Sequence, residues 1–205
     1  MDNANTAPRP EMEEAFRNYF LTGPVHEDWA AWSRLFTDDA TYDDHFWGTF
    51  RGPAEIQRFL EGTMSFAAHV YSPLMWYAID RNRVVYQVVN RVDNPVSGRA
   101  PIDFPSLQVI EYAGDGRWAA ETDWWTVAEM KLFNQRHRAA LAEAGGQMVD
   151  PLSRADWGDW VDWARPSEGH VARPSWLGRD VQPIGSMADM DFGVRHERPD
   201  RAPRG

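Results

Sequence analysis

The first third of the chain has apolar residues at helical spacing. A first stripe consists of Met12, Phe16, Tyr19 and Phe20. A second consists of Trp29, Trp32, Leu35 and Phe36, and a third, which follows Gly52-Pro53, of Ile56, Phe59 and Leu60. Residues three or four positions apart share one face of a helix, so these stripes predict three amphipathic helices. Two short strands are predicted between the second and third helices, over residues 40–46 and 48–51.

Beyond residue 62 the pattern changes to that of strands. Alternating and β-prone runs predict four strands, over residues 69–79, 83–92, 104–112 and 117–125. Short turn-rich links between them favour hairpins and an antiparallel sheet. Thr126 and Glu129 have capping-box spacing, which predicts a last helix. Because helices precede strands, the predicted class is α+β: a cone-shaped, curved antiparallel sheet closed by N-terminal helices around a cavity.

Composition divides the chain into three predicted parts: a flexible N-terminal arm over residues 1–10, a folded domain over 11–146, and an irregular extension over 147–205. The extension is rich in Pro, Gly and Trp. Its tryptophans at 157, 160 and 163 recur every third residue. This spacing predicts a helical or 3₁₀ turn that packs on the domain or on a second subunit, with a lid over a pocket as the alternative.

The charge and composition exclude several classes of function. A net charge of -10 argues against nucleic acid, which rewards clustered Lys and Arg. No apolar run reaches the ~18 residues of a membrane span, and no signal layout opens the chain, so no membrane partner and a cytoplasmic location are expected. The chain has no Cys, and its His residues lack metal-ligand spacing, so neither a metal nor a cofactor is expected. Eleven Trp residues require either a thick core or an aromatic-lined cavity.

Candidate acids and bases gather around the predicted turn after residue 42. Successive strand residues alternate faces, so Tyr42 and Asp44 share one face while Asp43 takes the other. A carboxyl group beside aromatic rings has its pKa raised by desolvation, which suits Asp44 as a general base. His45 could join it only through a bulge or turn, for which Gly48 provides the flexibility. The alternative interpretation is a solvated strand end.

Further polar residues lie in the later strands. Glu121 and Asp123 share a face, as a cavity dyad with split pKa values or as a wet outer face, and periodicity does not decide between them. His69 could be a base, a hydrogen-bonding group or a structural residue. Asn90 and Gln108 interrupt apolar strands, as pocket residues or as residues near strand ends. The expected apolar walls of the pocket are Tyr42, Trp47, Trp76 and Trp124.

Three segments resemble a known family: WAAWSRLFTDDATY at 29–42, GTFRGPAEI at 48–56 and YAGDGRW at 112–118. They resemble the nuclear-transport-factor-2-like superfamily, in its SnoaL-like and ketosteroid-isomerase-like branch, over roughly residues 11–135. The resemblance implies an α+β barrel that forms a homodimer or higher homo-oligomer. It also implies a cofactor-independent lyase or isomerase that dehydrates, isomerises or cyclises a hydrophobic, aromatic or polycyclic molecule. A non-catalytic binding or assembly module, and a retro-aldol lyase or hydrolase, are the alternatives on the same scaffold.

The same resemblance assigns roles to individual residues. The catalytic aspartate of ketosteroid isomerases falls on Asp44 and their oxyanion tyrosine nearest to Tyr19. Their second oxyanion acid falls on Gln108, a departure that argues against steroid isomerisation. The base of SnoaL-type cyclases falls on Asp123, and the histidine of scytalone-dehydratase-like proteins falls nearest to His69. The adjacent Asp44-His45 also looks like the acid-His pair of many SnoaL-like proteins.

The residue pattern and the resemblance together predict a catalytic role for each candidate residue. Asp44, alone or with His45, would be the general base. Tyr19 and Asn90 would polarise the substrate, and Asp123 would be a second acid or the base.

Overall fold

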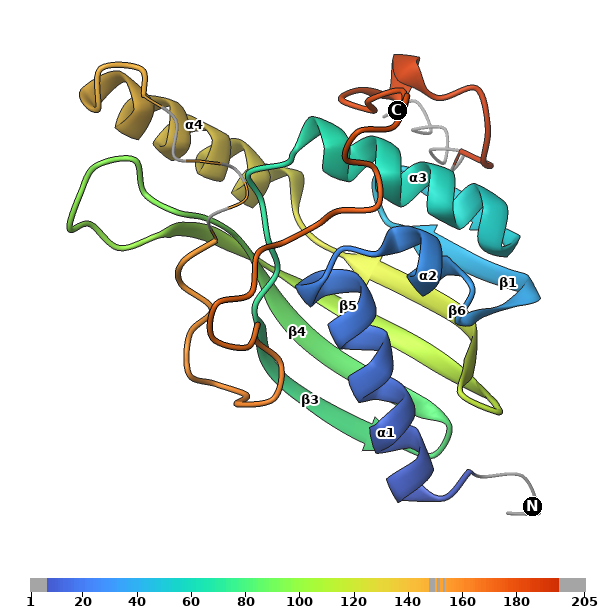
Figure 1. Cartoon of the computed structure of the whole chain (residues 1–205). Coiled ribbons are helices and arrows are strands. Elements are labelled where there is room, and N and C mark those ends of the chain that lie inside the picture. The colour runs from blue at the N-terminus through green and yellow to red at the C-terminus, as the bar shows by residue number, and fades with distance from the viewer. Residues whose placement is uncertain (1–6, 148–149, 151, 153, 196–205) are drawn as a thin grey trace, which may run out of the picture.

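The computed structural model describes residues 7–147, 150, 152 and 154–195 and confirms the α+β class (Figure 1). In chain order the elements are α1 (Arg9–Phe20), η1 (Leu21–Val25), α2 (Trp29–Ser33), β1 (Phe36–Asp44), β2 (Gly48–Arg51), α3 (Gly52–Phe66), β3 (Leu74–Asp80), β4 (Arg83–Val92), β5 (Ile102–Gly114), β6 (Arg117–Trp124), α4 (Val127–Glu143) and η2 (Met187–Asp189). Figure 1 shows α1, α2 and α3 on the same face of a curved sheet.

The sheet has six strands in the order β2-β1-β6-β5-β4-β3. All neighbours are antiparallel except β1 and β6, which run parallel. The sheet is therefore mixed, whereas the short turn-rich links in the sequence predict an antiparallel one. It is also unclosed, since β2 and β3 remain as edges, so helices cover a curved sheet and no complete barrel forms. The parallel pair joins strands that are far apart in the sequence, and no local pattern reveals such a neighbour.

Some boundaries differ from those predicted. The second helix ends at Ser33, because Phe36 is already the first residue of β1 and pairs with β6. The third strand begins at Leu74, although its pattern starts at His69. Pro73 directly before it has no backbone N–H to donate to a sheet ladder. The apolar spacing thus identifies buried residues better than it identifies element ends.

The core lies between the helices and the concave face of the sheet. The predicted stripe of α1 is fully buried: Met12, Phe16, Tyr19 and Phe20. Phe16 packs on β3 and β4, with ring centroids 5.0 Å from Tyr77 and 5.3 Å from Tyr86. Each such apolar side chain stabilises the fold by about 1.5–3 kcal/mol on burial. This packing fixes the angle of α1 and carries its Tyr19 into the interior.

Residues 154–195 form a segment that we name the C-terminal strap. In Figure 1 it runs, in orange to red, from the side of β3 and β4 to the region of α3. The backbone N–H of Ser175 donates to the carbonyl of Glu27 at 2.9 Å, and Val194 exchanges two 2.8 Å backbone hydrogen bonds with Thr49. The strap is therefore tied to the domain at both its middle and its end.

The tryptophan repeat of the strap forms turns and bends without a helix. Trp157 and Trp163 pack against the core, and the Trp163 ring centroid lies 5.8 Å from that of Tyr77. Trp160 is 42% exposed, and the guanidinium carbon of Arg91 lies 5.2 Å from the centroid of the Trp160 ring. Packing on the domain, the first of the two predicted roles, thus holds for two of the three rings.

Within the part of the chain that the structure describes, no helix has the length and apolarity to cross a membrane.

Candidate functional site

A cavity of about 380 Å³ lies between the helices and the concave face of the sheet. Most of the residues predicted for the site line it: Tyr19, Tyr42, Asp44, Trp47, His69, Asn90, Gln108 and Asp123. Of the described residues that line it, none is Arg or Lys. Glu27, at another part of the wall, is paired with Arg154 from outside the lining, whereas the described lining supplies no Arg or Lys to Asp44, Glu121 or Asp123.

The strand register explains why residues distant in sequence meet in this cavity. Asp44 pairs with Asp123, Asp123 with Gln108, and Gln108 with Tyr86, so one row crosses β1, β6, β5 and β4. Residues paired across neighbouring strands point to the same face. The row therefore places two carboxyl groups, an amide and a phenol side by side. The preceding inward row contains Tyr42 opposite Glu121, which adds a third carboxyl group. We name Asp44, Glu121 and Asp123 the acid cluster.

Glu121 is buried beneath two tyrosines. Its Oε2 accepts a hydrogen bond from the Tyr19 hydroxyl at 2.5 Å, and its Oε1 accepts one from the Tyr86 hydroxyl at 3.1 Å. The two hydroxyl oxygens lie 3.0 Å apart. Burial raises the pKa of Glu121 to about 7, although both tyrosine hydrogen bonds act in the opposite direction. Glu121 therefore exchanges its proton near neutral pH.

Asp123 holds its proton more firmly than Glu121. Its Oδ2 accepts a hydrogen bond from the Tyr42 hydroxyl, and its Oδ1 has no donor among the described residues. Burial, followed by the charges of Glu121 and Asp44, raises the pKa of Asp123 well above its usual range. A hydrogen bond between the two side chains further raises the pKa of Asp123 and lowers that of Glu121. Of the two carboxyl groups, Asp123 is therefore the one that the mutual hydrogen bond favours as the proton carrier.

Asp44 is surrounded by hydrogen-bond donors. Its Oδ1 accepts from the backbone N–H groups of Phe46 and Trp47, both at 2.7 Å, and its Oδ2 accepts from the Trp125 indole at 3.2 Å. Burial raises the pKa of Asp44 above its usual 3.8, and these three donors oppose that rise. Asp44 is thus a fixed, dry carboxylate with a strengthened affinity for a proton.

The placement predicted for His45 is wrong. Its side chain is exposed and does not line the cavity. The strand ends at Asp44, whose carboxylate accepts from the backbone N–H groups of Phe46 and Trp47 and so stabilises a turn in which His45 points outward. Gly48 supports the turn with a φ of 114°, a conformation that favours glycine. The flexibility expected from Gly48 thus turns His45 away from the site.

Two of the residues predicted to form the apolar walls do not line the cavity. Trp76 and Trp124 are each 43% exposed and lie outside the cavity. The Trp76 indole donates to Gln87 Oε1 at 2.6 Å on the outer face of the sheet. Trp124 has the opposite parity to Asp123 on β6, whereas Trp125 has the same parity and reaches the cavity. Strand alternation alone distinguishes Trp125 from Trp124.

Glu121 is predicted only as half of a candidate dyad with Asp123, and Tyr86 is not predicted as a site residue. The shared face of Glu121 and Asp123 is visible in the sequence as a candidate dyad, and the structure shows that this face points inward. Tyr86 carries no comparable signal. Its role becomes apparent only from its place opposite Gln108 and from its hydrogen bond to Glu121.

The cavity has a second group of polar side chains, on β4 and β5. Asn90 Nδ2 and Gln108 Nε2 both donate to the Ser106 hydroxyl, at 3.1 and 2.7 Å. His69 lines the cavity and stacks on His137 with ring centroids 4.9 Å apart. Burial lowers the pKa of both imidazoles, so they are neutral at physiological pH. These groups can form hydrogen bonds to a ligand without adding charge.

Among the residues that the structure describes, no group of three or more His, Asp or Glu side chains is arranged to hold a metal ion. What the acid cluster can do is proton chemistry. It combines a carboxyl group that retains its proton with a neighbouring carboxylate, inside one apolar cavity.

The family model of the SnoaL-like domain matches residues 15–132, more than half of the chain. The chain belongs to the SnoaL-like domain family. The resemblance found in the sequence is thereby confirmed. The matched region contains the whole acid cluster, and the C-terminal strap lies beyond it.

Several solved structures are similar to this chain at low sequence identity. An LEH-like epoxide hydrolase of M. tuberculosis is 20% identical, with 65% of this chain and 96% of that chain covered and a TM-score of 0.51. A hypothetical protein from Catenulispora acidiphila with a ketosteroid isomerase-like fold, in complex with trimethylamine, is 18% identical, with coverages of 67% and 95% and a TM-score of 0.46. An NTF2-like protein of unknown function from Burkholderia pseudomallei is 17% identical, with coverages of 60% and 96% and a TM-score of 0.48. A comparison with curated proteins gives no match.

Proposed function

We propose that this SnoaL-like protein is a cofactor-independent lyase or isomerase that transfers protons at carbon in a hydrophobic, oxygen-bearing small molecule. One observation carries the proposal: the three carboxyl groups of the acid cluster lie together in a cavity in which no described lining residue is Arg or Lys, whereas Glu27, elsewhere in the wall, is paired with Arg154. Such a cluster must retain protons at neutral pH and so contains an acid and a base together.

Asp44 and Asp123 take complementary roles in the proposed reaction. Asp44 removes a proton from the carbon next to a substrate carbonyl. The electrons of that C–H bond form a C=C bond, and the carbonyl oxygen accepts the proton of Asp123 to give an enol. Return of a proton at a different carbon completes an isomerisation. If a β-hydroxyl group accepts the proton of Asp123 and leaves as water, the same pair completes a dehydration.

The cavity walls favour an aromatic or polycyclic ligand. Aromatic rings from α2, β1, the following turn and α3 surround the space next to the acid cluster: Trp29, Trp32, Tyr42, Trp47 and Phe59. These rings exclude water, which raises the proton affinity of the carboxylates and strengthens hydrogen bonds to a developing oxyanion.

The proposal is testable with 2-tetralone, a bicyclic ketone with exchangeable protons next to its carbonyl group. Wild-type protein in D₂O is expected to accelerate deuterium incorporation at these carbons, as followed by proton NMR. Asp123→Asn is expected to slow this exchange by about 10²-fold, because it removes the proton donor to the carbonyl oxygen. The dissociation constant for 2-tetralone, measured by calorimetry, should change by less than about threefold, since the substitution preserves side-chain size.

Asp43→Asn is the matched control for that experiment. Asp43 is one residue from Asp44, and its Oδ1 accepts a hydrogen bond from the Thr49 hydroxyl at 2.7 Å. It does not line the cavity, so exchange should equal that of the wild type. If wild-type protein binds 2-tetralone without accelerating exchange, the chain is a binding module and the proposal is wrong.

The exchange rate is expected to have a bell-shaped pH dependence. It rises as Asp44 ionises, through a pKa that lies above the usual 3.8, and falls as Asp123 loses its proton. Glu121→Gln removes the charge that raises the pKa of Asp123, so its alkaline limb should move to lower pH. A pH series of the NMR exchange rate for wild type and Glu121→Gln measures this shift. An alkaline limb that stays in place or moves to higher pH would contradict the assignment of Asp123 as the acid.

A further inference from the structure

The C-terminal strap crosses α3 at one closely packed point. The backbone N–H of Ile184 donates to the carbonyl of Gly62 at 2.9 Å. A Cβ atom at Gly62 would lie 2.5 Å from Ile184 Cδ1 and 3.1 Å from the carbonyl oxygen of Gln182, so any larger residue would force the Ile184 side chain to move. Glycine inside a helix costs about 1 kcal/mol relative to alanine. The close approach of Ile184 explains why a glycine occupies this helical position.

A second glycine brings the strap to the mouth of the cavity. A Cβ atom at Gly185 would lie 2.5 Å from Cε2 of Phe66. Phe66 lines the cavity and is 62% exposed, so it marks the open end. Both Ile184 and Gly185 line the same cavity, and Ile184 is only 3% exposed. The strap therefore contributes to the wall beside the mouth.

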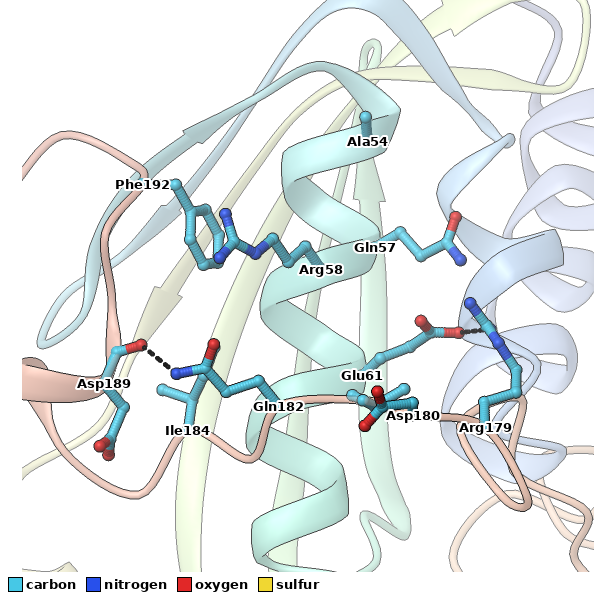
Figure 2. A pocket seen from close by; sticks show the side chains of 11 residues that line it. Ala54, Gln57, Arg58, Glu61, Arg179, Asp180, Gln182, Ile184, Asp189 and Phe192 are labelled. Atoms are coloured by element: carbon cyan, nitrogen blue, oxygen red, sulfur yellow. Dashed lines mark hydrogen bonds and ion pairs between the residues drawn. The ribbon is translucent and has the colours of Figure 1, made fainter.

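Ionic and stacking contacts hold the strap on both sides of this crossing (Figure 2). Before it, the buried Glu61 Oε1 accepts from Arg179 Nη1 at 2.6 Å and from the Ser175 hydroxyl at 2.7 Å. After it, the Arg58 guanidinium lies 4.1 Å from the Phe192 ring centroid. Ile184 lies between these anchors and cannot move away without breaking one of them.

Ile184 also separates two spaces. On the outer side of α3, the strap and the helix enclose a pocket of about 420 Å³, lined by Arg58, Glu61, Arg179 and other polar residues. Ile184 lines this outer pocket as well as the inner cavity. Its side chain is therefore a partition between a charged groove and the apolar part of the cavity.

We infer that the strap completes the ligand cavity and that Ile184 determines the largest ring system that the cavity accepts. The inference rests on the proposed function and deepens it, because it assigns to one residue the size limit of the substrates that the same site accepts, with their apolar end at the strap. A larger side chain at position 184 would occupy this space. A smaller one would lengthen the cavity toward the outer pocket.

Binding of three phenols of increasing size tests this inference: phenol, 2-naphthol and 2-phenanthrol, measured by calorimetry on the full chain. Ile184→Trp is expected to weaken 2-naphthol binding by about tenfold or more, while phenol binding changes by less than about threefold. Ile184→Ala is expected to strengthen 2-phenanthrol binding by about tenfold, with phenol unchanged. Circular dichroism melting verifies that each variant is folded, and Ile184→Ala suffices if Ile184→Trp does not fold.

Val181→Trp is the matched control. Val181 belongs to the strap and lines the outer pocket but not the inner cavity, so the order of the three affinities should equal that of the wild type. Equal affinity ratios in wild type, Ile184→Ala and Ile184→Trp would overturn the inference. Because this readout is binding without turnover, its outcome is independent of whether Asp44 and Asp123 catalyse exchange.

Discussion

Asp44→Asn is expected to slow deuterium exchange into 2-tetralone by about 10²- to 10⁴-fold, the range over which a positioned general base contributes to catalysis. The variant keeps an oxygen that can accept the backbone N–H groups of Phe46 and Trp47, so the turn after β1 should persist. Its amide cannot take a proton from carbon. The loss should therefore appear in the rate at saturating 2-tetralone, with little change in the dissociation constant.

Asp43→Asn again provides the control, because it makes the same chemical change one residue away, outside the cavity. Melting curves should show both variants folded. Asp44 would lose its role as base if Asp44→Asn exchanged 2-tetralone at the wild-type rate. A loss confined to binding would instead make Asp44 a ligand-positioning residue.

The position of Asp44 could be predicted because a strand has a simple rule. Because strand residues alternate between faces, Tyr42 and Asp44 share one face, and aromatic neighbours indicate that this face is apolar. The same rule puts His45 on the face opposite to Asp44, and its side chain is exposed. The expectation that a bulge or turn would return His45 to Asp44 is wrong, because the Asp44 carboxylate binds the backbone N–H groups of Phe46 and Trp47 and the strand ends there.

The partners of Asp44 could be predicted less well, because they depend on strand order. Glu121 and Asp123 meet Asp44 only because β6 lies parallel to β1, across a separation of about eighty residues. Local hydrophobic patterns show which residues share a face but not which strands are neighbours. For the same reason the pattern identifies the pair of Glu121 and Asp123 without showing that it points inward.

The role of the strap was the least predictable feature. Its Pro and Gly content indicates irregular structure, yet the contacts that fix it include ion pairs and close glycine packing with elements far earlier in the chain. Arg154 and Glu27 are an example, since 127 positions separate them in the chain. Neither residue lies in a motif that predicts the other.

Arg154→Ala is expected to destabilise the protein by about 3–5 kcal/mol, because it removes one partner of a buried ion pair. Arg154 Nη2 lies 2.7 Å from Glu27 Oε2, and both side chains are almost fully buried, with exposures of 4% and 1%. Burial raises the pKa of Glu27 to about 7, and the charge of Arg154 opposes that rise. Without Arg154, Glu27 must be protonated to remain in the fold at neutral pH.

The destabilisation should therefore depend on pH. Below about pH 5, Glu27 is already protonated in the folded wild type, so removal of Arg154 costs less. Above about pH 7, the wild type has an ionised pair, whereas the variant must still hold a proton on Glu27, so the difference in unfolding free energy grows. Urea unfolding at both ends of this range measures the difference. Arg165→Ala is the control, since its pair with Asp162 is exposed and should contribute less than about 1 kcal/mol. An Arg154→Ala variant as stable as Arg165→Ala at high pH would show that the strap is not anchored through Glu27.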